Sequence, residues 1–241
     1  MSSHKSLLNA FPWRVAWGPL RGTRCRMTST GDGVLAKLAG TYEEEIYPAL
    51  ADAVARCPAV VVDIGAAEGF YVSGLARAVP GARVIAYEAK AEWQSRIRHL
   101  AGLNGVAERC EIRGFCDSAE FRRLLESEGG RSMFLLMDIE GGEFNLLTPT
   151  VVPMLSGAEL LVELHEPAER SAGDALALML GASHDVEMIW AREVRVPREV
   201  SSPAWRIAAT LLPPVRRRLQ EGRAYRMRWL HAVPRATPLG H

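Results

Sequence analysis

Two glycines four residues apart form the first feature of the sequence that could bind a ligand. Gly65 and Gly69 follow a continuous apolar run that contains Asp63, and a helical pattern begins directly after them. Glycine lets the backbone turn tightly and approach a ligand with no Cβ in the way. A dinucleotide-binding turn would carry a third glycine where Ala67 stands. The acids Asp63 and Glu68 suit a positively charged ligand better than a pyrophosphate, although a plain tight turn would use the same glycines.

Acidic residues end the first five expected strands. Glu88 follows Gly65 by 23 residues, close to the distance at which an acid binds ribose hydroxyls in nucleoside-binding enzymes. A solvated acid at a strand end would look the same in the sequence. The five acids are Asp63, Glu88, Asp117, Asp138 and Glu163. Because the carboxyl ends of parallel strands meet at one edge of a sheet, we expect a negatively charged cleft that attracts a cation such as a sulfonium.

His165 is the side chain best placed to act as a general base. It follows the fifth expected strand, whose end should lie beside Asp138, and an imidazole titrates near neutral pH. We expect His165 to be catalytic, and Asp138 and Glu140 are the next candidates. The alternative is that His165 only hydrogen-bonds a neighbouring residue. Asp138, His165 and Glu166 could together bind a divalent metal. Oxygen-rich metal sites need more carboxylates than this pattern offers, so we expect no metal.

These residues are separated by a regular alternation of apolar runs and helical patterns. Such an alternation predicts a doubly wound, Rossmann-like α/β sheet that is mostly parallel. We expect its last strand to be antiparallel. The expected strands are 59–64, 83–88, 110–114, 132–137, 158–164, 185–190 and 225–233. The expected helices are 42–56, 70–79, 91–103, 118–126, 143–155 and 172–180, although two prolines interrupt the range 143–155. Ligands bind such sheets outside the carboxyl ends of the strands, where the acids stand.

The composition is that of a globular protein. The chain has 241 residues, of which 48% are hydrophobic and 24% charged, which excludes wholesale disorder and fits one large domain. We expect this domain to cover residues 41–241, after an N-terminal extension, residues 1–40, that is irregular or hairpin-like and could pack on a second copy of the chain. The apolar runs are too short or too broken to cross a membrane. The four cysteines form no C-x-x-C pair, which argues against zinc or a disulfide framework and favours a reducing cytoplasm.

The net charge of +1 hides two basic regions. The first thirty residues contain five basic side chains and no acid. Mitochondrial transit peptides have such a composition, but prolines and glycines interrupt any amphipathic helix here and favour a basic surface. Residues 191–241 contain eleven Arg and three Glu. With Trp205, Tyr225 and Trp229 interleaved among arginines such as Arg228, this segment could bind nucleic-acid phosphates. A solvated helix face and an edge strand explain the same residues, so we expect no nucleic-acid partner.

Two segments resemble known methyltransferases. The sequence VVDIGAAEG at residues 61–69 resembles the first motif of class I methyltransferases that depend on S-adenosylmethionine. The sequence DIEGGEFNLL at residues 138–147 is similar to the D-x-E-G-x-E-x-x-x-L signature of the FkbM-type methyltransferases. Residues 161–165 resemble the next strand of that family, and residues 40–43 resemble its usual start before the first helix. The resemblance covers about residues 38–166.

The resemblance implies an enzyme that uses S-adenosylmethionine. It implies a cofactor site made of Glu43, Asp63, Gly65, Ala66, Gly69, Glu88, Cys116, Asp117 and Asp138. In that site Glu88 would hold the ribose hydroxyls, Cys116 and Asp117 would contact the adenine, and Asp138 would lie near the methyl group. The family mostly methylates hydroxyls of small molecules and sugars, so we expect O-methylation of such an acceptor, although no catalytic base carries over. The alternatives are an NAD-dependent oxidoreductase on the same fold, and an RNA-modifying protein that uses the Arg-rich segment.

Overall fold

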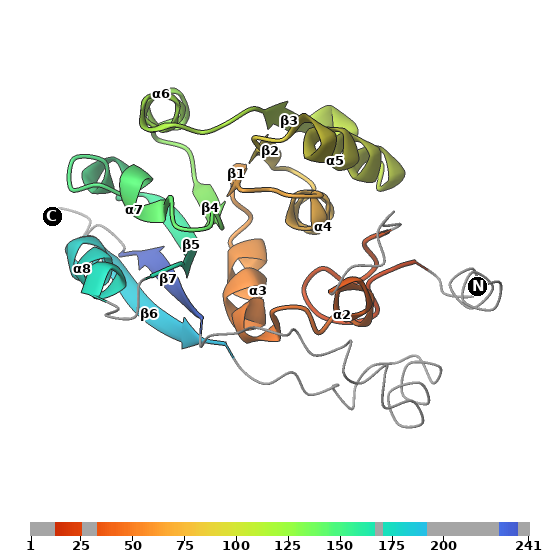
Figure 1. The fold of residues 1–241 in the computed structure, drawn as a ribbon, viewed down its shortest axis with the longest axis horizontal. Coiled ribbons are helices and arrows are strands. Elements are labelled where there is room, and N and C mark those ends of the chain that lie inside the picture. Colours follow the sequence, from red (N-terminus) through yellow and green to blue (C-terminus); the bar gives the residue numbers. More distant parts are fainter. Residues whose placement is uncertain (1–12, 26–32, 167–170, 192–226, 236–241) are drawn as a thin grey trace, which may run out of the picture.

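A seven-stranded mixed sheet runs through the centre of the molecule (Figure 1). The computed structural model describes residues 13–25, 33–166, 171–191 and 227–235. The strands are β1 (Val60–Ile64), β2 (Arg83–Tyr87), β3 (Cys110–Arg113), β4 (Met133–Met137), β5 (Ala158–Leu164), β6 (His184–Trp190) and β7 (Arg228–Pro234). Their order is β3-β2-β1-β4-β5-β7-β6; β1 to β5 run parallel, and β7 is antiparallel to both of its neighbours. This order confirms the predicted doubly wound sheet with an antiparallel last strand.

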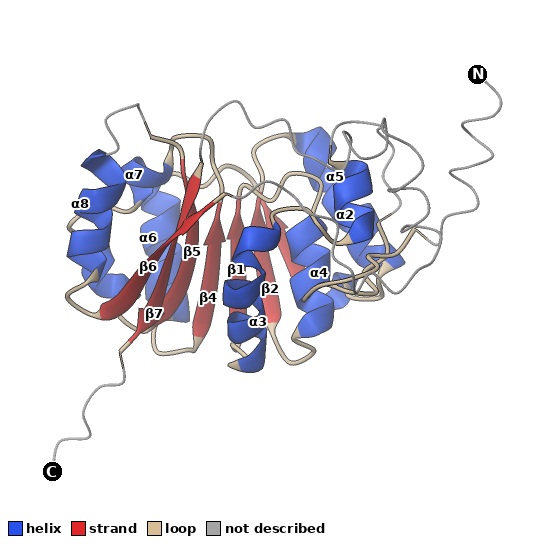
Figure 2. Cartoon of the chain, turned by 90° about the horizontal axis from the view of Figure 1, so that it is seen from below, coloured by secondary structure: helices blue, strands red, loops and turns tan. Residues whose placement is uncertain are grey.

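Helices fill the connections and cover both faces of the sheet. They are α2 (Val34–Ala39), α3 (Tyr47–Ala55), α4 (Phe70–Ala78), α5 (Ala91–Leu103), α6 (Ser118–Glu128), α7 (Glu143–Leu146) and α8 (Ser171–Leu180). Short 3-10 turns lie at Glu44–Ile46, Ala107–Arg109 and Val152–Leu155. Helices α3 and α4 lie in front of the strands in Figure 2, whereas α6 to α8 pack on the opposite face.

The strands are apolar on both faces because alternate side chains pack under different helices. In β1, Val61 belongs to the same buried cluster as Leu75 of α4. Its neighbour Val62 belongs to the cluster on the other face, with Leu124 of α6. All five residues of β1 are buried, which is why a continuous apolar run, rather than an alternating one, marks this strand in the sequence.

The register brings the carboxyl ends of the central strands level with one another. Ile64 pairs with Tyr87 on one side and with Met137 on the other. The N–H of Asp138 donates to the carbonyl oxygen of Ile64 at 2.9 Å. The residues that directly follow β1, β2 and β4 therefore meet at one edge of the sheet.

The residues before α2 form a hairpin that packs into the core. Arg14 and Arg24 face each other in an isolated antiparallel bridge. Val15 and Cys25, next to them, are buried in the apolar cluster that also contains residues of α3 and α4. Helix α2 is a short regular element within the range 1–40, for which the sequence predicts a hairpin-like or irregular extension.

Two expected helices differ from the structure. The single helix expected over 143–155 is wrong: α7 ends at Leu146, and Val152–Leu155 form a separate 3-10 turn. Pro149 and Pro153 explain the break, because proline lacks the N–H that a helix interior requires. The helix expected over 42–56 begins later, at Tyr47, after a 3-10 turn that follows Glu43 in the left-handed conformation, with φ 51°.

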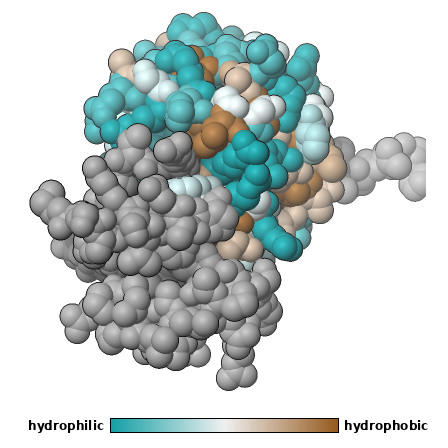
Figure 3. All heavy atoms as spheres, turned by 90° about the vertical axis from the view of Figure 1, so that its right-hand side faces the viewer, coloured by the Kyte–Doolittle hydropathy of each residue, from teal (hydrophilic) through white to brown (hydrophobic). Residues whose placement is uncertain are grey.

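None of the described helices is both long enough and apolar enough to cross a bilayer. Figure 3 shows the side of the molecule on which α2 and α5 lie, and its described part is mainly hydrophilic with small apolar patches. The exposed large apolar side chains in the described residues are Phe115, Leu178 and Trp190. Of these three, Phe115 lies in the cleft described next.

Candidate active site

A cleft of about 510 Å³ opens at the carboxyl ends of β1 to β4. Its walls come from the turn after β1, the end of β2, the loop after β3 and the loop after β4. Among the site residues predicted from the sequence, the lining includes Gly65, Glu88, Cys116, Asp117, Asp138 and Glu140. The others, Glu43, Asp63, Ala66, Gly69 and His165, do not line the cleft directly. A concave site at this edge is where ligands bind doubly wound sheets.

The glycines of the turn between β1 and α4 adopt conformations that other residues rarely adopt. Gly65 has φ 92° and Gly69 has φ 86°. The N–H groups of Gly65 and Ala66 both donate to the carbonyl oxygen of Tyr87, at 3.0 Å. A Cβ on Gly65 would lie 1.8 Å from the carbonyl oxygen of Asp138. Glycine is therefore required at position 65 because two strand ends touch there, which is a different reason from the approach of a ligand.

Glu88 joins the glycine turn to its own loop from within the cleft. Its Oε2 accepts the N–H of Ala67 at 3.0 Å, and its Oε1 accepts the N–H of Lys90 at 2.8 Å. Each carboxylate oxygen has two lone pairs, so each retains an acceptor site beyond these bonds. Glu88 is thus held in place by both neighbouring segments and is not a freely solvated acid.

The loop after β3 contributes an exposed aromatic ring that the sequence pattern did not single out. Phe115 lines the cleft and is 74% exposed, and an exposed ring in a cleft is typical of a ligand contact. Burial raises the pKa of the neighbouring Cys116 thiol to about 12, so this side chain stays protonated and packs as a small apolar group. Asp117 caps α6 by accepting the N–H of Glu120 at 2.8 Å. One feature of the sequence could have identified Phe115 as a candidate: it stands directly before Cys116 and Asp117, the two residues predicted to contact an adenine.

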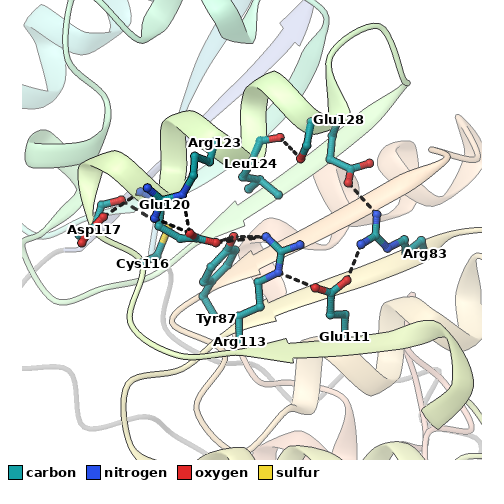
Figure 4. A network of polar contacts seen from close by, with 11 residues as sticks. Arg83, Tyr87, Glu111, Arg113, Cys116, Asp117, Glu120, Arg123, Leu124 and Glu128 are labelled. Carbon is teal, nitrogen blue, oxygen red and sulfur yellow. Dashed lines mark hydrogen bonds and ion pairs between the residues drawn. The ribbon is translucent and has the colours of Figure 1, made fainter.

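A network of polar side chains supports this wall of the cleft (Figure 4). The hydroxyl of Tyr87 donates to Glu120 at 3.0 Å and accepts from Nη1 of Arg113 at 2.7 Å. Nε of Arg113 donates to Glu111 at 2.7 Å, and Glu111 in turn pairs with Arg83. The network ties β2, β3 and the first turn of α6 together, and so fixes the loop that carries the exposed ring.

Two carboxyl groups at the ends of β1 and β4 take up protons more readily than usual. Burial, followed by the charges of Asp138 and Glu88, raises the pKa of Asp63 to about 8. Burial and the charge of Glu43 raise the pKa of Asp138 to about 6, although His165 acts in the opposite direction. Oδ2 of Asp63 and Oδ1 of Asp138 are buried and have no hydrogen-bond partner within the described residues. Such atoms at a strand edge indicate a place where a ligand or water binds.

His165 is oriented by a carboxylate that the sequence pattern did not single out. Its Nδ1 lies 2.8 Å from Oε1 of Glu143, a side chain with 0% exposure. Burial opposes the ionisation of Glu143, but hydrogen bonds from His165 and from the N–H of Gly141 outweigh burial and lower the pKa of this carboxyl. Because an ionised carboxylate only accepts, Nδ1 carries a proton, and in the neutral ring Nε2 is the nitrogen that keeps its lone pair. The signal for Glu143 is its place in the D-x-E-G-x-E signature.

The other ring nitrogen of His165 faces the acids at the strand ends. Nε2 lies 3.4 Å from Glu140 and 3.7 Å from Asp138. Burial opposes protonation of the ring, but the hydrogen bond to Glu143 and the surrounding negative charges outweigh it and raise the pKa of His165 above its ordinary value. The structure therefore brings His165, Asp138 and Glu140 together, as the sequence predicts; their catalytic role stays a prediction.

The same cluster could hold a divalent cation, although through a different set of residues from the one considered in the sequence. Asp138, Glu163 and His165 each offer one ligand atom, and these atoms lie within 4.8 Å of one another. Glu166 does not join them, because its carboxylate is 2.7 Å from Nε of Arg228 and is buried in that pair. The suggested combination of Asp138, His165 and Glu166 is therefore wrong in its third member.

Glu43 lies next to the site but does not line the cleft. It is 2% exposed, and the hydroxyl of Tyr71 hydrogen-bonds its carboxylate. Its charge nevertheless reaches the strand ends, since it contributes to the raised pKa of Asp138. Direct contact between Glu43 and a cofactor stays a prediction.

Most of the Arg-rich C-terminal segment lies outside the described residues, including Trp205 and Tyr225. The described part, residues 227–235, engages its side chains within the fold. Arg228 pairs with Glu166, and Trp229 is fully buried. The suggestion that these two residues could contact a nucleic acid is therefore wrong.

No protein-family model matches the sequence, and no curated protein matches it. The structure is similar to solved structures that include cofactor-bound Rv0187 from MTB, with 18% identity over 88% of this chain and 84% of that chain, at a TM-score of 0.47. The O-methyltransferase TomG from Streptomyces achromogenes, in complex with SAM, has 18% identity over 86% of this chain and 92% of that chain, at a TM-score of 0.46. The O-methyltransferase from Bacillus cereus, in complex with SAH, has 13% identity over 76% of each chain, at a TM-score of 0.47.

Proposed function

We propose that this protein is an S-adenosylmethionine-dependent methyltransferase that acts on a hydroxyl of a small molecule or sugar. The observation that carries the proposal is the cleft at the ends of β1 to β4. It combines a glycine turn, an acid fixed beside that turn, an exposed aromatic ring and a group of carboxylates. A nucleoside that bears a positive charge matches these four features.

The chemistry of the lining residues fits the parts of this cofactor. The ring of Phe115, beside the apolar Cys116, offers a flat surface for an adenine. The acceptor sites that Glu88 retains suit the two ribose hydroxyls. Asp138, whose Oδ1 makes no hydrogen bond within the described residues, would stand near the sulfonium. Asp63, Ala66 and Gly69 would form the base of the turn and support this arrangement from behind the cleft.

The cofactor supplies an electrophilic methyl group when it is bound. The chain must then orient the acceptor hydroxyl in line with that group and remove its proton. We propose that Nε2 of His165 accepts the proton of the acceptor hydroxyl, because the hydrogen bond to Glu143 keeps the ring's own proton on Nδ1. Asp138 and Glu140, at 3.7 and 3.4 Å from Nε2, would stabilise the imidazolium that forms.

We also place the protein with the FkbM-type methyltransferases, on the strength of the D-x-E-G-x-E signature. Each acid of this signature has its own position in the structure. Asp138 ends β4 in the cleft, Glu140 faces Nε2 of His165, and Glu143 binds Nδ1. A motif whose three acids surround one histidine supports a shared catalytic arrangement.

Isothermal titration calorimetry tests the cofactor assignment without knowledge of the acceptor. We expect the protein to bind S-adenosylmethionine and S-adenosylhomocysteine but not NAD. Glu88→Ala should weaken this binding by about 1 to 3 kcal/mol, the range for a hydrogen bond to a charged group. Glu92→Ala removes an acid of α5 that is 73% exposed and should leave the affinity unchanged. Circular dichroism confirms that both variants are folded.

Binding of NAD without binding of S-adenosylmethionine would identify an oxidoreductase instead. Unchanged affinity in a folded Glu88→Ala variant would show that this acid only holds the turn. A screen of sugar and polyketide hydroxyls with labelled S-adenosylmethionine then identifies the acceptor class, which the catalytic tests require.

A further inference from the structure

A second cleft, of about 430 Å³, lies at the opposite edge of the sheet from the candidate active site. Arg14 and Arg24 of the hairpin, Arg77 of α4 and residues 102–105 line it. Helix α4 starts at the glycine turn and α5 starts after Glu88, so both run back from the carboxyl edge. Arg77, in the last turn of α4, and the end of α5 therefore lie at the amino edge. The two clefts share no lining residue.

The three guanidinium groups of this cleft have no acidic partner among the residues that the structure describes. Within the described residues, none of the three forms an ion pair, and their hydrogen bonds all use Nη1. Arg14 donates to a backbone carbonyl oxygen at 3.3 Å, as do Arg24 and Arg77. A guanidinium has five N–H donors, and Nε and Nη2 of each donate to no acceptor in the described part of the chain. The first thirty residues of the chain also contain no acid that could neutralise them.

The backbone forces two of these charges together. Arg14 and Arg24 are the paired residues of an antiparallel bridge, and backbone hydrogen bonds of 2.9 and 2.7 Å between their neighbours flank the pair. This is the non-hydrogen-bonded type of pair, in which opposing side chains come closest. Like charges at directly opposite positions destabilise a hairpin. Both side chains are exposed, so water screens part of this repulsion; an anion bound between them would relieve the rest, and no carboxylate of the described residues pairs with either one.

The hairpin is nevertheless anchored firmly in this position. The N–H of Arg24 donates to Oδ1 of Asn104 at 2.8 Å, and Nδ2 of Asn104 donates back to the carbonyl oxygen of Arg24 at 2.9 Å. Arg77 reaches from α4 to Thr23 of the same hairpin at 3.3 Å. The three arginines are thus held around one cavity by contacts that do not consume their charge.

We propose that this arginine cleft, formed by Arg14, Arg24 and Arg77, binds a phosphate or diphosphate group of a small molecule. The planar fork of a guanidinium matches two oxygens of a phosphate, and several forks together can surround a tetrahedral anion. A polyvalent anion offsets the repulsion among three cations better than a single carboxylate does. The volume of the cleft leaves room for the organic group that carries the phosphate.

Titration calorimetry with inorganic pyrophosphate at fixed ionic strength tests this proposal. We expect saturable binding to one site. Arg14→Gln and Arg24→Gln should each weaken it at least about tenfold, since each removes a charge from the site. These two changes are safer than a change of Arg77, because the side chains of Arg14 and Arg24 each make a single hydrogen bond within the described residues, whereas that of Arg77 makes two. Arg98→Gln, at an exposed arginine of α5 outside the cleft, should change the affinity less than about twofold.

Two further measurements distinguish the arginine cleft from other sites for an anion. Lys90→Gln removes the basic side chain of the candidate active site; if it abolishes pyrophosphate binding while Arg14→Gln does not, the anion binds there and the proposal is wrong. Absence of saturable binding up to about 10 mM would also overturn it. The proposal would also be wrong if the wild-type protein bound a single-stranded RNA but not pyrophosphate, and if Arg14→Gln abolished the binding of that RNA. Circular dichroism of each variant shows that a lost affinity reflects the site and not the fold.

Discussion

Replacing Gly65 by alanine tests whether the contact between the ends of β1 and β4 shapes the candidate active site. The added Cβ would lie 1.8 Å from the carbonyl oxygen of Asp138, whereas real Cβ contacts essentially never fall below 3.0 Å. The two strand ends must therefore separate by about 1.2 Å, the difference between these distances. The left-handed φ of 92° adds strain of its own, because an alanine side chain disfavours it.

The expected cost follows from these two contributions. A residue other than glycine in the left-handed region costs about 1–2 kcal/mol, and forcing extra atoms into a packed region costs about 1–3 kcal/mol. Gly65→Ala should therefore lower the free energy of unfolding by about 2–5 kcal/mol, out of the roughly 5–15 kcal/mol of a typical domain. Because a displacement of about 1 Å can reduce catalysis about a hundredfold, cofactor binding and turnover should both suffer.

Urea denaturation and calorimetry with S-adenosylmethionine measure the two effects. Gly81→Ala is the matched control, since a Cβ there meets nothing within 4 Å and its φ is not in the left-handed region. The control should keep wild-type stability within about 0.5 kcal/mol, as surface substitutions usually do. If Gly65→Ala behaves like the control in both assays, the strand contact is not what requires glycine at this turn.

Three other predictions concern ionisable side chains in the described structure. His165→Ala should lower turnover at least about tenfold and leave S-adenosylmethionine affinity within about threefold. The wild-type rate should fall as the pH decreases through the raised pKa of His165; full turnover in the variant would show that alignment alone suffices. Because the pKa of Asp63 is raised to about 8, the folded protein keeps a proton that the unfolded chain releases from about pH 4 upward. Stability measured in urea should fall between about pH 4 and 8, and an equal fall in Asp63→Asn would contradict this assignment. Arg228→Met removes the ion-pair partner of Glu166, which is 4% exposed and keeps only the N–H of Gly173 among the described residues. The change should cost about 3–5 kcal/mol of unfolding free energy; a loss below about 1 kcal/mol would be inconsistent with a buried pair.

The elements of the fold follow from local patterns in the sequence. The apolar run before Gly65, the proline and glycine that precede β2, and the acids at the strand ends can each be recognised within a few residues. Helix α5 begins and ends where its pattern predicts, at Ala91–Leu103. The single helix predicted over 143–155 is wrong for a reason that is also local, because Pro149 and Pro153 outweigh the apolar pattern. The parallel, doubly wound arrangement follows from the general rules for alternating strands and helices, whereas the insertion of the antiparallel β7 between β5 and β6 does not.

The sequence also identifies the acids at the sheet edge, but not what each of them does. Asp117 caps a helix and Glu88 holds a turn, and both roles depend on N–H groups whose positions the fold decides. Glu166 is withdrawn from the site by Arg228, which lies 62 residues away in the chain. A side chain's partners depend on the register of strands that are distant in sequence, and no local pattern contains that register.

The fine geometry of both clefts was decided by the tertiary structure alone. Glu143 sets the proton on His165 across 22 residues of sequence, and the Cβ that Gly65 must lack would meet a carbonyl group at the end of β4. The arginine cleft joins a hairpin to the ends of two helices. Residue types and spacing determine which elements form and which edge of the sheet carries the chemistry, because those depend on burial and backbone preference. Distances of a few ångströms between side chains from different elements arise only once those elements pack, which is why the tautomer of His165 and the charge cluster at Arg14 emerge only in the folded chain.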